Sequence, residues 1–259
     1  EYYIWASEGN FIKGDFQQGY ALKRRAIALA EKAGLKFAIS QSCCDMGYYC
    51  NVDARYDSAR YYFRKGLEAG EDLSEAGEAC RTMLTNYASS FLFEGKTDSA
   101  LVYTIRASER STADKDTAML IENLNQLGTI YRRKKDLENC IANFEQALHL
   151  CELRGNHNAV AFIYGNIATA YCDWNRPVDA IPFSEKAVEY ALKTGNKRRI
   201  GTCYVNLGAI QIRLVQMRAE GIATLLKAIP ILEEVNDRRL LCDAYNYLVN
   251  AYRMDANLN

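Results

Sequence analysis

The stretch Leu127–Leu150 reads LGTIYRRKKDLENCIANFEQALHL and decides the fold of this chain. It joins an apolar start, a run of basic residues and an amphipathic segment. Within that segment Cys140 and Ala147 are small residues seven positions apart. This spacing places both side chains on one face of an α-helix, two turns from each other. Its recurrence elsewhere would make the stretch one copy of a repeat.

The spacing does recur along the chain. Six such pairs of small residues follow one another at intervals of 40, 41, 40, 40 and 41 residues. The pairs are Gly19 with Ala26, Ala59 with Gly66, Ala100 with Ala107, Cys140 with Ala147, Ala180 with Ala187, and Gly221 with Ala228. A regular period of this kind is typical of repeat architectures.

A second row of small residues lies upstream of each later pair. Its members are Gly47, Ala88, Gly128, Ala168 and Gly208, with Val249 in the last place. An apolar residue precedes each member, and in most units an aromatic residue follows three positions later. Apolar positions at i, i+1 and i+4 describe one face of an α-helix. Each unit therefore contains two helices, and the small residues allow these helices to approach closely.

Short polar segments separate the helices. Those within units are VDARYD, EGKTD, RKKDL, DWNRP and QMRAE, and those between units are AGLK, AGED, RGNH, TGNK and EVND. Four of the second group carry Gly where a helix C-cap is expected, and the fifth carries Asn. The repeating unit is helix, tight turn, helix, tight turn, and it must stack on its neighbours to bury both faces.

This pattern resembles the tetratricopeptide repeat (TPR) family over almost the whole chain. The segments NLNQLGTIYRRKKDLENCIANFEQAL and YGNIATAYCDWNRPVDAIPFSEKA carry the resemblance most clearly. The period is nearer 40 than the family's common 34 residues, as in the long-repeat branch that includes kinesin light chains and peptide-pheromone receptors. The resemblance implies an all-α, right-handed α-solenoid of antiparallel helix pairs.

We expect one solenoid over residues 1–259. Its units lie near 1–34, 35–72, 73–113, 114–155, 156–195 and 196–236, with a partial unit at 237–259. An extra residue near LVQMRAEG, with Gln211 in place of an aromatic residue, predicts a distorted sixth unit. Pro182 lies in a helix that begins near Pro177, and it either removes an early hydrogen bond or shifts the helix start.

The bulk composition limits the function classes. The 32 basic and 32 acidic residues cancel, so no global field favours nucleic acid or an anionic membrane. No apolar stretch is long enough for a transmembrane helix. Nine irregularly spaced cysteines favour a reducing, cytoplasmic compartment, with an extracytoplasmic sensor region as the alternative. The missing initiator Met and the half-unit at the C-terminal end indicate a fragment of a longer chain.

The sequence predicts no enzyme, no cofactor and no metal site. It has no P-loop, GxGxxG or GxSxG motif and only two histidines. Cys140 and Cys151 share a helix face, but His149 points roughly away from Cys151 and no CxxC pair exists. We interpret these cysteines as small core residues and His149 as a surface residue. The run Arg132–Lys135 is interpreted as a solvated turn at a helix C-terminus, not as a nucleic-acid site.

The resemblance implies a ligand groove lined by the first helix of each unit. Two positions before the second small row stand Asp45, Asn86, Gln126, Asn166, Asn206 and Tyr247, with Asn125 and Asn246 adjoining. Amides in such a row can hydrogen-bond an extended peptide backbone, as related TPR proteins do, or can be bonded within the solenoid. Our candidate peptide-binding residues are Asn86, Asn125, Gln126, Asn166, Asn206, Asn246, Arg132, Arg133, Arg213 and Arg253.

Arginine side chains suit carboxylates on a ligand, so we expect a mildly acidic extended partner. Asp173 lies between Arg133 and Arg213 in the repeat register and should neutralise part of their charge. Tyr48, Tyr61 and Tyr62 are candidates for a recognition or dimer patch, with core packing as the alternative.

Three functional interpretations remain open. The first is a non-catalytic protein- or peptide-binding scaffold. The second is a sensory or regulatory region of a larger bacterial signalling or transcription-regulatory protein, because YDSARYYFRKGL and TDSALVYTIRAS resemble TPR segments of such regulators. The third is homotypic assembly, including a homodimer.

Overall fold

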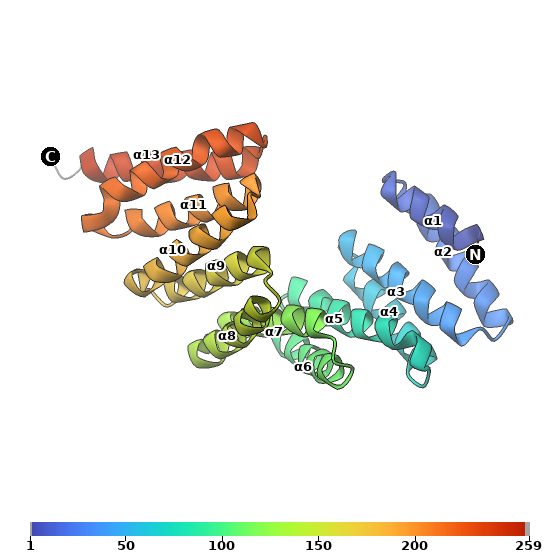
Figure 1. The fold of residues 1–259 in the computed structure, drawn as a ribbon. Coiled ribbons are helices and arrows are strands. Elements are labelled where there is room, and N and C mark those ends of the chain that lie inside the picture. Colours follow the sequence, from blue (N-terminus) through green and yellow to red (C-terminus); the bar gives the residue numbers. More distant parts are fainter. Residues whose placement is uncertain (1, 257–259) are drawn as a thin grey trace. The chain divides into compact units, whose positions relative to one another are not determined.

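The computed structural model describes residues 2–256 and is built from α-helices (Figure 1). Thirteen α-helices and two short 3-10 helices make up the regular structure of this range, and none of its residues is in a strand. The all-α solenoid architecture of helix pairs is therefore confirmed. None of the helices in the range is both long and apolar enough to cross a membrane.

The chain forms two compact units, which we describe separately. Unit 1 covers Glu1–Ile130 and unit 2 covers Tyr131–Asn259. Unit 1 contains α1 (Tyr2–Ile12), α2 (Phe16–Lys32), α3 (Lys36–Val52), α4 (Tyr56–Gly70), η1 (Ser74–Ala76), α5 (Gly77–Phe93), α6 (Thr97–Ala113) and most of α7 (Thr117–Arg133). Unit 2 contains α8 (Leu137–Leu153), α9 (His157–Asp173), α10 (Pro177–Thr194), α11 (Lys197–Ile212), η2 (Val215–Met217), α12 (Arg218–Glu234) and α13 (Arg238–Ala256).

The odd-numbered helices, here called first helices, form one layer of each unit. Five of them, α1, α3, α5, α9 and α11, pack against the even-numbered second helix that follows. Successive first helices also contact one another, as in α3 with α5, α9 with α11 and α11 with α13. Second helices pack mainly on the first helices before and after them. Within each unit, the first helices therefore pack closer to one another than the second helices do.

Ten of the twelve helix connections turn on one residue with positive φ. These residues are Gly14, Gly34, Ala54, Gly95, Lys115, Lys135, Gly155, Asn175, Gly195 and Asn236. Only glycine adopts this conformation without steric cost, and asparagine tolerates it better than most residues. The predicted glycine caps at Gly34, Gly155 and Gly195, and the predicted asparagine cap at Asn236, are confirmed.

The predicted cap at Gly70 is wrong. Gly70 is the buried last residue of α4, and a Cβ on it would overlap the Ser40 hydroxyl. The α4–α5 connection uses the 3-10 helix η1 instead of a left-handed turn. Gly70 is therefore required for close packing and not for backbone freedom.

The structure also tests the predictions for the sixth repeat, residues 196–236, and for the prolines of α10. The α11–α12 connection at LVQMRAEG forms the 3-10 helix η2, which accommodates the extra residue. Gln211 stands at the aromatic position and is buried. Pro177 occupies the first turn of α10, and the helix continues through Pro182 to Thr194.

Helix approach depends on glycine at specific positions. A Cβ on Gly47 in α3 would overlap the fully buried Phe63 ring of α4. In unit 2, the Cβ positions of Gly208 and Gly221 would lie 3.0 and 2.9 Å from each other's backbone oxygens. A Cβ on Gly208 would also lie 2.7 Å from Leu225 Cγ. These contacts hold α3 against α4 and α11 against α12.

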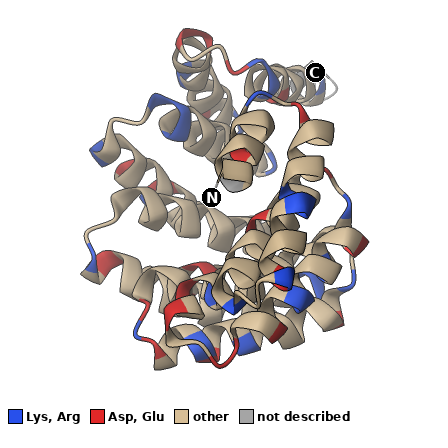
Figure 2. Ribbon diagram, turned by 90° about the vertical axis from the view of Figure 1, so that its right-hand side faces the viewer, with Lys and Arg blue, Asp and Glu red and all other residues tan. Residues whose placement is uncertain are grey.

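Charged residues of both signs are interspersed on helices and turns (Figure 2). This distribution agrees with the balance of 32 basic and 32 acidic side chains. Residues of neither sign dominate the ribbon in this view, so local charge pairs matter more than a global field.

We expect Gly47→Ala to lower the free energy of unfolding by about 1–3 kcal/mol, because the added methyl group overpacks a closed interface. Gly165→Ala in α9 is the matched control, since its Cβ would meet no atom within 4 Å. That change should instead raise the free energy of unfolding by about 0.5–1 kcal/mol. Urea denaturation measures both values. Equal effects of the two substitutions would contradict the packing role of Gly47.

Candidate functional site

The predicted amide row is divided between the two units. Asn86, Asn125 and Gln126 lie on α5 and α7 in unit 1, and all three are half-buried. In unit 2, Asn166 is half-buried while Asn206 and Asn246 are exposed. The row positions therefore lie on first helices, as predicted, but with very different accessibility.

The Gln126 side chain is hydrogen-bonded to other side chains of unit 1. Thr104 Oγ1 donates a hydrogen bond to its Oε1 at 3.1 Å, and its Nε2 donates to Ser89 Oγ at 2.7 Å. Both polar atoms of the amide are thus engaged between α5, α6 and α7. Gln126 matches the alternative in which an amide is bonded within the solenoid.

Asp45 in α3 occupies the same repeat position as Gln126 in α7. Its carboxylate forms an ion pair with a buried lysine of α2. Lys23 of α2 has a fully buried side chain, and its Nζ lies 2.8 Å from Asp45 Oδ2 and 3.8 Å from Glu8 Oε1. Lys23 precedes Asp45 by 22 residues, as Thr104 precedes Gln126. The same second-helix position therefore holds a row residue in both places.

This second-helix position alternates in character along the chain. It lies four residues after the first member of each small pair. It is polar at Lys23, Thr104 and Ser184 and apolar at Phe63, Phe144 and Leu225, and all six side chains are buried. The polar or apolar character of this position therefore repeats every two repeats, whereas the helix pattern itself repeats in each one.

The predicted arginines are placed as follows. Arg132 is half-buried, and its Nε lies 3.5 Å from Asp173 Oδ2. Arg213 is exposed and donates to Asn175 Oδ1 at 3.5 Å. Arg133 and Arg253 are exposed. Asp173 therefore pairs with Arg132.

An apolar hollow on the first-helix face of unit 1 was not predicted. We call it the Tyr48–Phe93 hollow; it has a volume of about 400 Å³ and is lined by Tyr48, Asn51, Val52, Tyr56, Asn86, Ser89 and Phe93. Val52 and Phe93 are 57% and 61% exposed, and Phe93 stacks on Tyr56 with ring centroids 5.8 Å apart. Asn51 Nδ2 donates to the Asn86 carbonyl at 2.9 Å.

The sequence does contain a signal for this hollow, at the position five residues after the small row of each repeat. Five residues after the small row, α3 and α5 have Val52 and Phe93, the next three first helices have Arg133, Asp173 and Arg213, and α13 has Met254. The charged members of this column were identified from the sequence, and the apolar ones were not. Exposed apolar residues at a position that is charged elsewhere indicate a contact surface.

A second hollow of about 330 Å³ adjoins this one. It shares Tyr48 and Asn86 and is also lined by Glu8, Ile12, Cys44, Asp45, Tyr49 and Thr82. Of the tyrosines proposed for a patch, Tyr48 and Tyr61 are exposed, whereas Tyr62 packs against the core of unit 1. Tyr48 therefore belongs to the first-helix face, and Tyr61 lies on the second helix α4.

Cys140, Cys151 and His149 differ in burial. Cys140 and Cys151 are fully buried, as interpreted from the sequence, and His149 is exposed. Among the described residues, no three His, Cys, Asp or Glu side chains are grouped to hold a metal ion. Burial raises the pKa of the Cys140 thiol to about 11.

Residues 117–193 match the family model of the tetratricopeptide repeat. This part of the chain therefore consists of tetratricopeptide repeats. Similar repeat folds occur in solved structures at low identity. A STAND protein of Pyrococcus horikoshii with a TPR sensor is 17% identical, with a TM-score of 0.78 over 98% of this chain. This chain spans 38% of the STAND chain.

Two further structures have a similar fold. BtubC (BKLC) of P. vanneervenii is 16% identical with a TM-score of 0.72, and the match covers 84% of this chain and 91% of BtubC. A Rap protein complexed with competence and sporulation factor is 12% identical with a TM-score of 0.63, and the match covers 99% of this chain and 76% of the Rap chain. No curated protein sequence matches this chain.

We expect Asp45→Leu to lower the free energy of unfolding by about 3 kcal/mol, because it leaves the buried Lys23 ammonium without its close partner. Lys23→Met should cost less, since Asp45 is 24% exposed and can be hydrated. The double variant should resemble Lys23→Met. Chemical denaturation of the three variants tests the pair, and a larger cost for Lys23→Met than for Asp45→Leu would contradict it.

Thiol labelling should follow burial. Cys242 is exposed, whereas Cys43 and Cys44 are buried and their thiol pKa is raised by burial to about 12. A raised pKa means that these thiols remain protonated at pH values well below it, so they lack the reactive thiolate. Iodoacetamide at about pH 8, near the ordinary thiol pKa, should modify Cys242 first, as read by peptide mass spectrometry. Equally fast labelling of Cys43 would contradict this order.

Proposed function

We propose that this TPR chain is a non-catalytic scaffold that binds a protein or an extended peptide through its first-helix face. The observation that carries the proposal is the Tyr48–Phe93 hollow, where exposed apolar side chains lie beside amide groups. Aromatic and aliphatic side chains supply contact area, and the amides can pair with peptide N–H and C=O groups. This combination is typical of a surface that binds a peptide with few sequence requirements.

The partner should bring an apolar side chain to this hollow. Tyr48, Val52 and Phe93 expose their side chains around it. Burial of such large apolar groups provides most of the affinity at peptide interfaces. Asn86, which lines both hollows of unit 1, lies where it can pair with the peptide backbone.

The arginines of unit 2 favour an acidic group on the partner. The Arg213 guanidinium has five N–H donors and is exposed, and its hydrogen bond to Asn175 is long at 3.5 Å. A carboxylate would form shorter, charge-assisted bonds with the same group. Asn206 is also exposed in unit 2, on the same helix α11 that ends before Arg213.

A sensory or regulatory region of a larger protein is the second candidate. It is favoured by the fold match to a TPR sensor that is one part of a longer STAND chain. In that case the first-helix face would still bind the signal-carrying peptide or protein. The coding sequence around this segment discriminates the two, since a neighbouring output domain supports the regulatory interpretation.

The test of the binding face is a peptide selection followed by titration. Peptides selected on the immobilised chain are titrated against Phe93→Ser and Arg213→Glu, with Val102→Ser as the control. Val102 is 56% exposed on the second helix α6. We expect Phe93→Ser to weaken binding by about tenfold or more, as for a central interface residue, and Val102→Ser to leave it unchanged.

Arg213→Glu should weaken only those peptides that contain an acidic residue. The proposal is wrong if both first-helix variants bind the selected peptides as tightly as the unmodified chain. It is also wrong if Val102→Ser has the larger effect. Light scattering over a dilution series tests homotypic assembly, which would show mass increasing with concentration without any peptide.

A further inference from the structure

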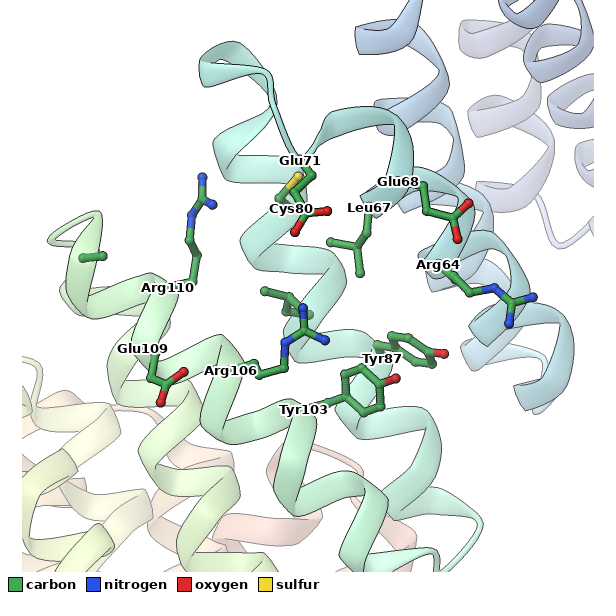
Figure 3. Close-up of a pocket in the computed structure, with 12 residues that line it drawn as sticks. Arg64, Leu67, Glu68, Glu71, Cys80, Tyr87, Tyr103, Arg106, Glu109 and Arg110 are labelled. Atoms are coloured by element: carbon green, nitrogen blue, oxygen red, sulfur yellow. The ribbon is translucent and has the colours of Figure 1, made fainter.

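A cavity of about 500 Å³ lies on the second-helix side of unit 1, between α4 and α6 (Figure 3). It is separate from the hollows of the first-helix face, with which it shares no lining residue. Its volume falls within the range of pockets that enclose small ligands. The function proposed above makes no use of it.

Both walls of this α4–α6 pocket carry charged side chains. The α4 wall has Glu68 and Glu71 together with Arg64, and the α6 wall has Arg106 and Arg110 together with Glu109. Figure 3 shows Glu71 and Arg106 extending into the pocket from these opposite walls. The α4 wall thus has an acidic excess and the α6 wall a basic excess, and Glu71 and Arg106 present one charge of each sign inside the pocket.

These charges do not neutralise one another. Across the described part of unit 1, no ion pair joins Glu68 or Glu71 to the arginines of α6. Arg110 Nε is bonded to Asp114 at 2.9 Å, whereas the Arg106 guanidinium lies 5.7 Å from the centroid of the Tyr103 ring. Glu71 and Arg106 thus retain hydrogen-bonding capacity toward the pocket.

The floor between the walls is largely apolar. It is formed by Leu67, Cys80, Leu84, Tyr87 and Tyr103. The Tyr87 and Tyr103 rings are tilted by 32° with their centroids 4.3 Å apart, and burial raises the pKa of Tyr87, which favours its neutral phenol. An apolar ligand body would gain contact area here, with the two phenol hydroxyl groups at the edge.

We infer that the α4–α6 pocket binds a short zwitterionic peptide with a bulky apolar side chain. The peptide ammonium pairs with Glu68 and Glu71, the carboxylate pairs with Arg106 and Arg110, and the apolar side chain lies on the floor. A single amino acid carries both charges on one carbon, so it does not reach two walls. A free peptide of about two to four residues places the charges at its two ends and suits a pocket of this size.

The experiment uses a free tripeptide with central phenylalanine, titrated into the full chain by calorimetry. Two further probes are the same tripeptide with an acetylated N-terminus and with an amidated C-terminus. We expect each cap to weaken binding at least fivefold, because each removes one of the two charges. In Glu71→Gln the acetyl cap should lose most of its effect, and in Arg106→Gln the amide cap should lose most of its effect.

The control variant is Lys186→Gln on α10, which occupies the same repeat position as Arg106 but lies in unit 2. It should bind all probes like the unmodified chain. The inference is overturned if no free tripeptide binds, or if the cap effects persist in both pocket variants. Equal binding of a doubly capped peptide would assign the pocket to an internal segment of a protein and would also overturn it.

Discussion

Close approach of the paired helices is the constraint on which the rest of the structure depends. A first helix can approach its second helix only where the side chain on one side is small enough for the one opposite. Gly47 accommodates the Phe63 ring, and Gly208 accommodates Leu225 while meeting Gly221 backbone to backbone. Because interiors are close-packed, a single methyl group at these places must displace a buried side chain. The repeat period follows because every repeat needs a small residue on one helix opposite a large side chain on the other.

The facing side chain also determines how each repeat is joined to the next. Where it is apolar, as at Phe63 or Leu225, it fills its own helix pair. At Lys23 and Thr104, where it is polar, it extends to a row residue on the next first helix, whereas the buried Ser184 hydroxyl makes no such bond. A buried lysine has to be paired, so Asp45 is fixed in place by the requirements of the core. Asp45 and Gln126, two of the residues predicted to line the groove, are therefore bonded within the protein and are not available to a ligand.

This division leaves different surfaces for recognition. In unit 1, the Tyr48–Phe93 hollow combines exposed apolar groups with amides, whereas unit 2 offers Arg213 and Asn206. The α4–α6 pocket is of a different kind, because Glu71 and Arg106 extend into it from two sides above an apolar floor. A repeat scaffold can carry several such surfaces, since the packing residues and the exposed residues occupy different positions of the same helix.

The sequence by itself determined the helix pairs, their period and most of their turns, because small residues, caps and apolar faces are local and periodic signals. It also identified Cys140 and Cys151 as core residues. Tertiary structure alone decided that Gly70 packs against Ser40, that Gln126 is bonded to Thr104 and Ser89, and that Lys23 is buried. These outcomes depend on which side chains meet across helices tens of residues apart. A one-dimensional pattern gives the position of each residue on its helix, but not the partner that occupies its hydrogen bonds or the space that neighbouring helices leave open.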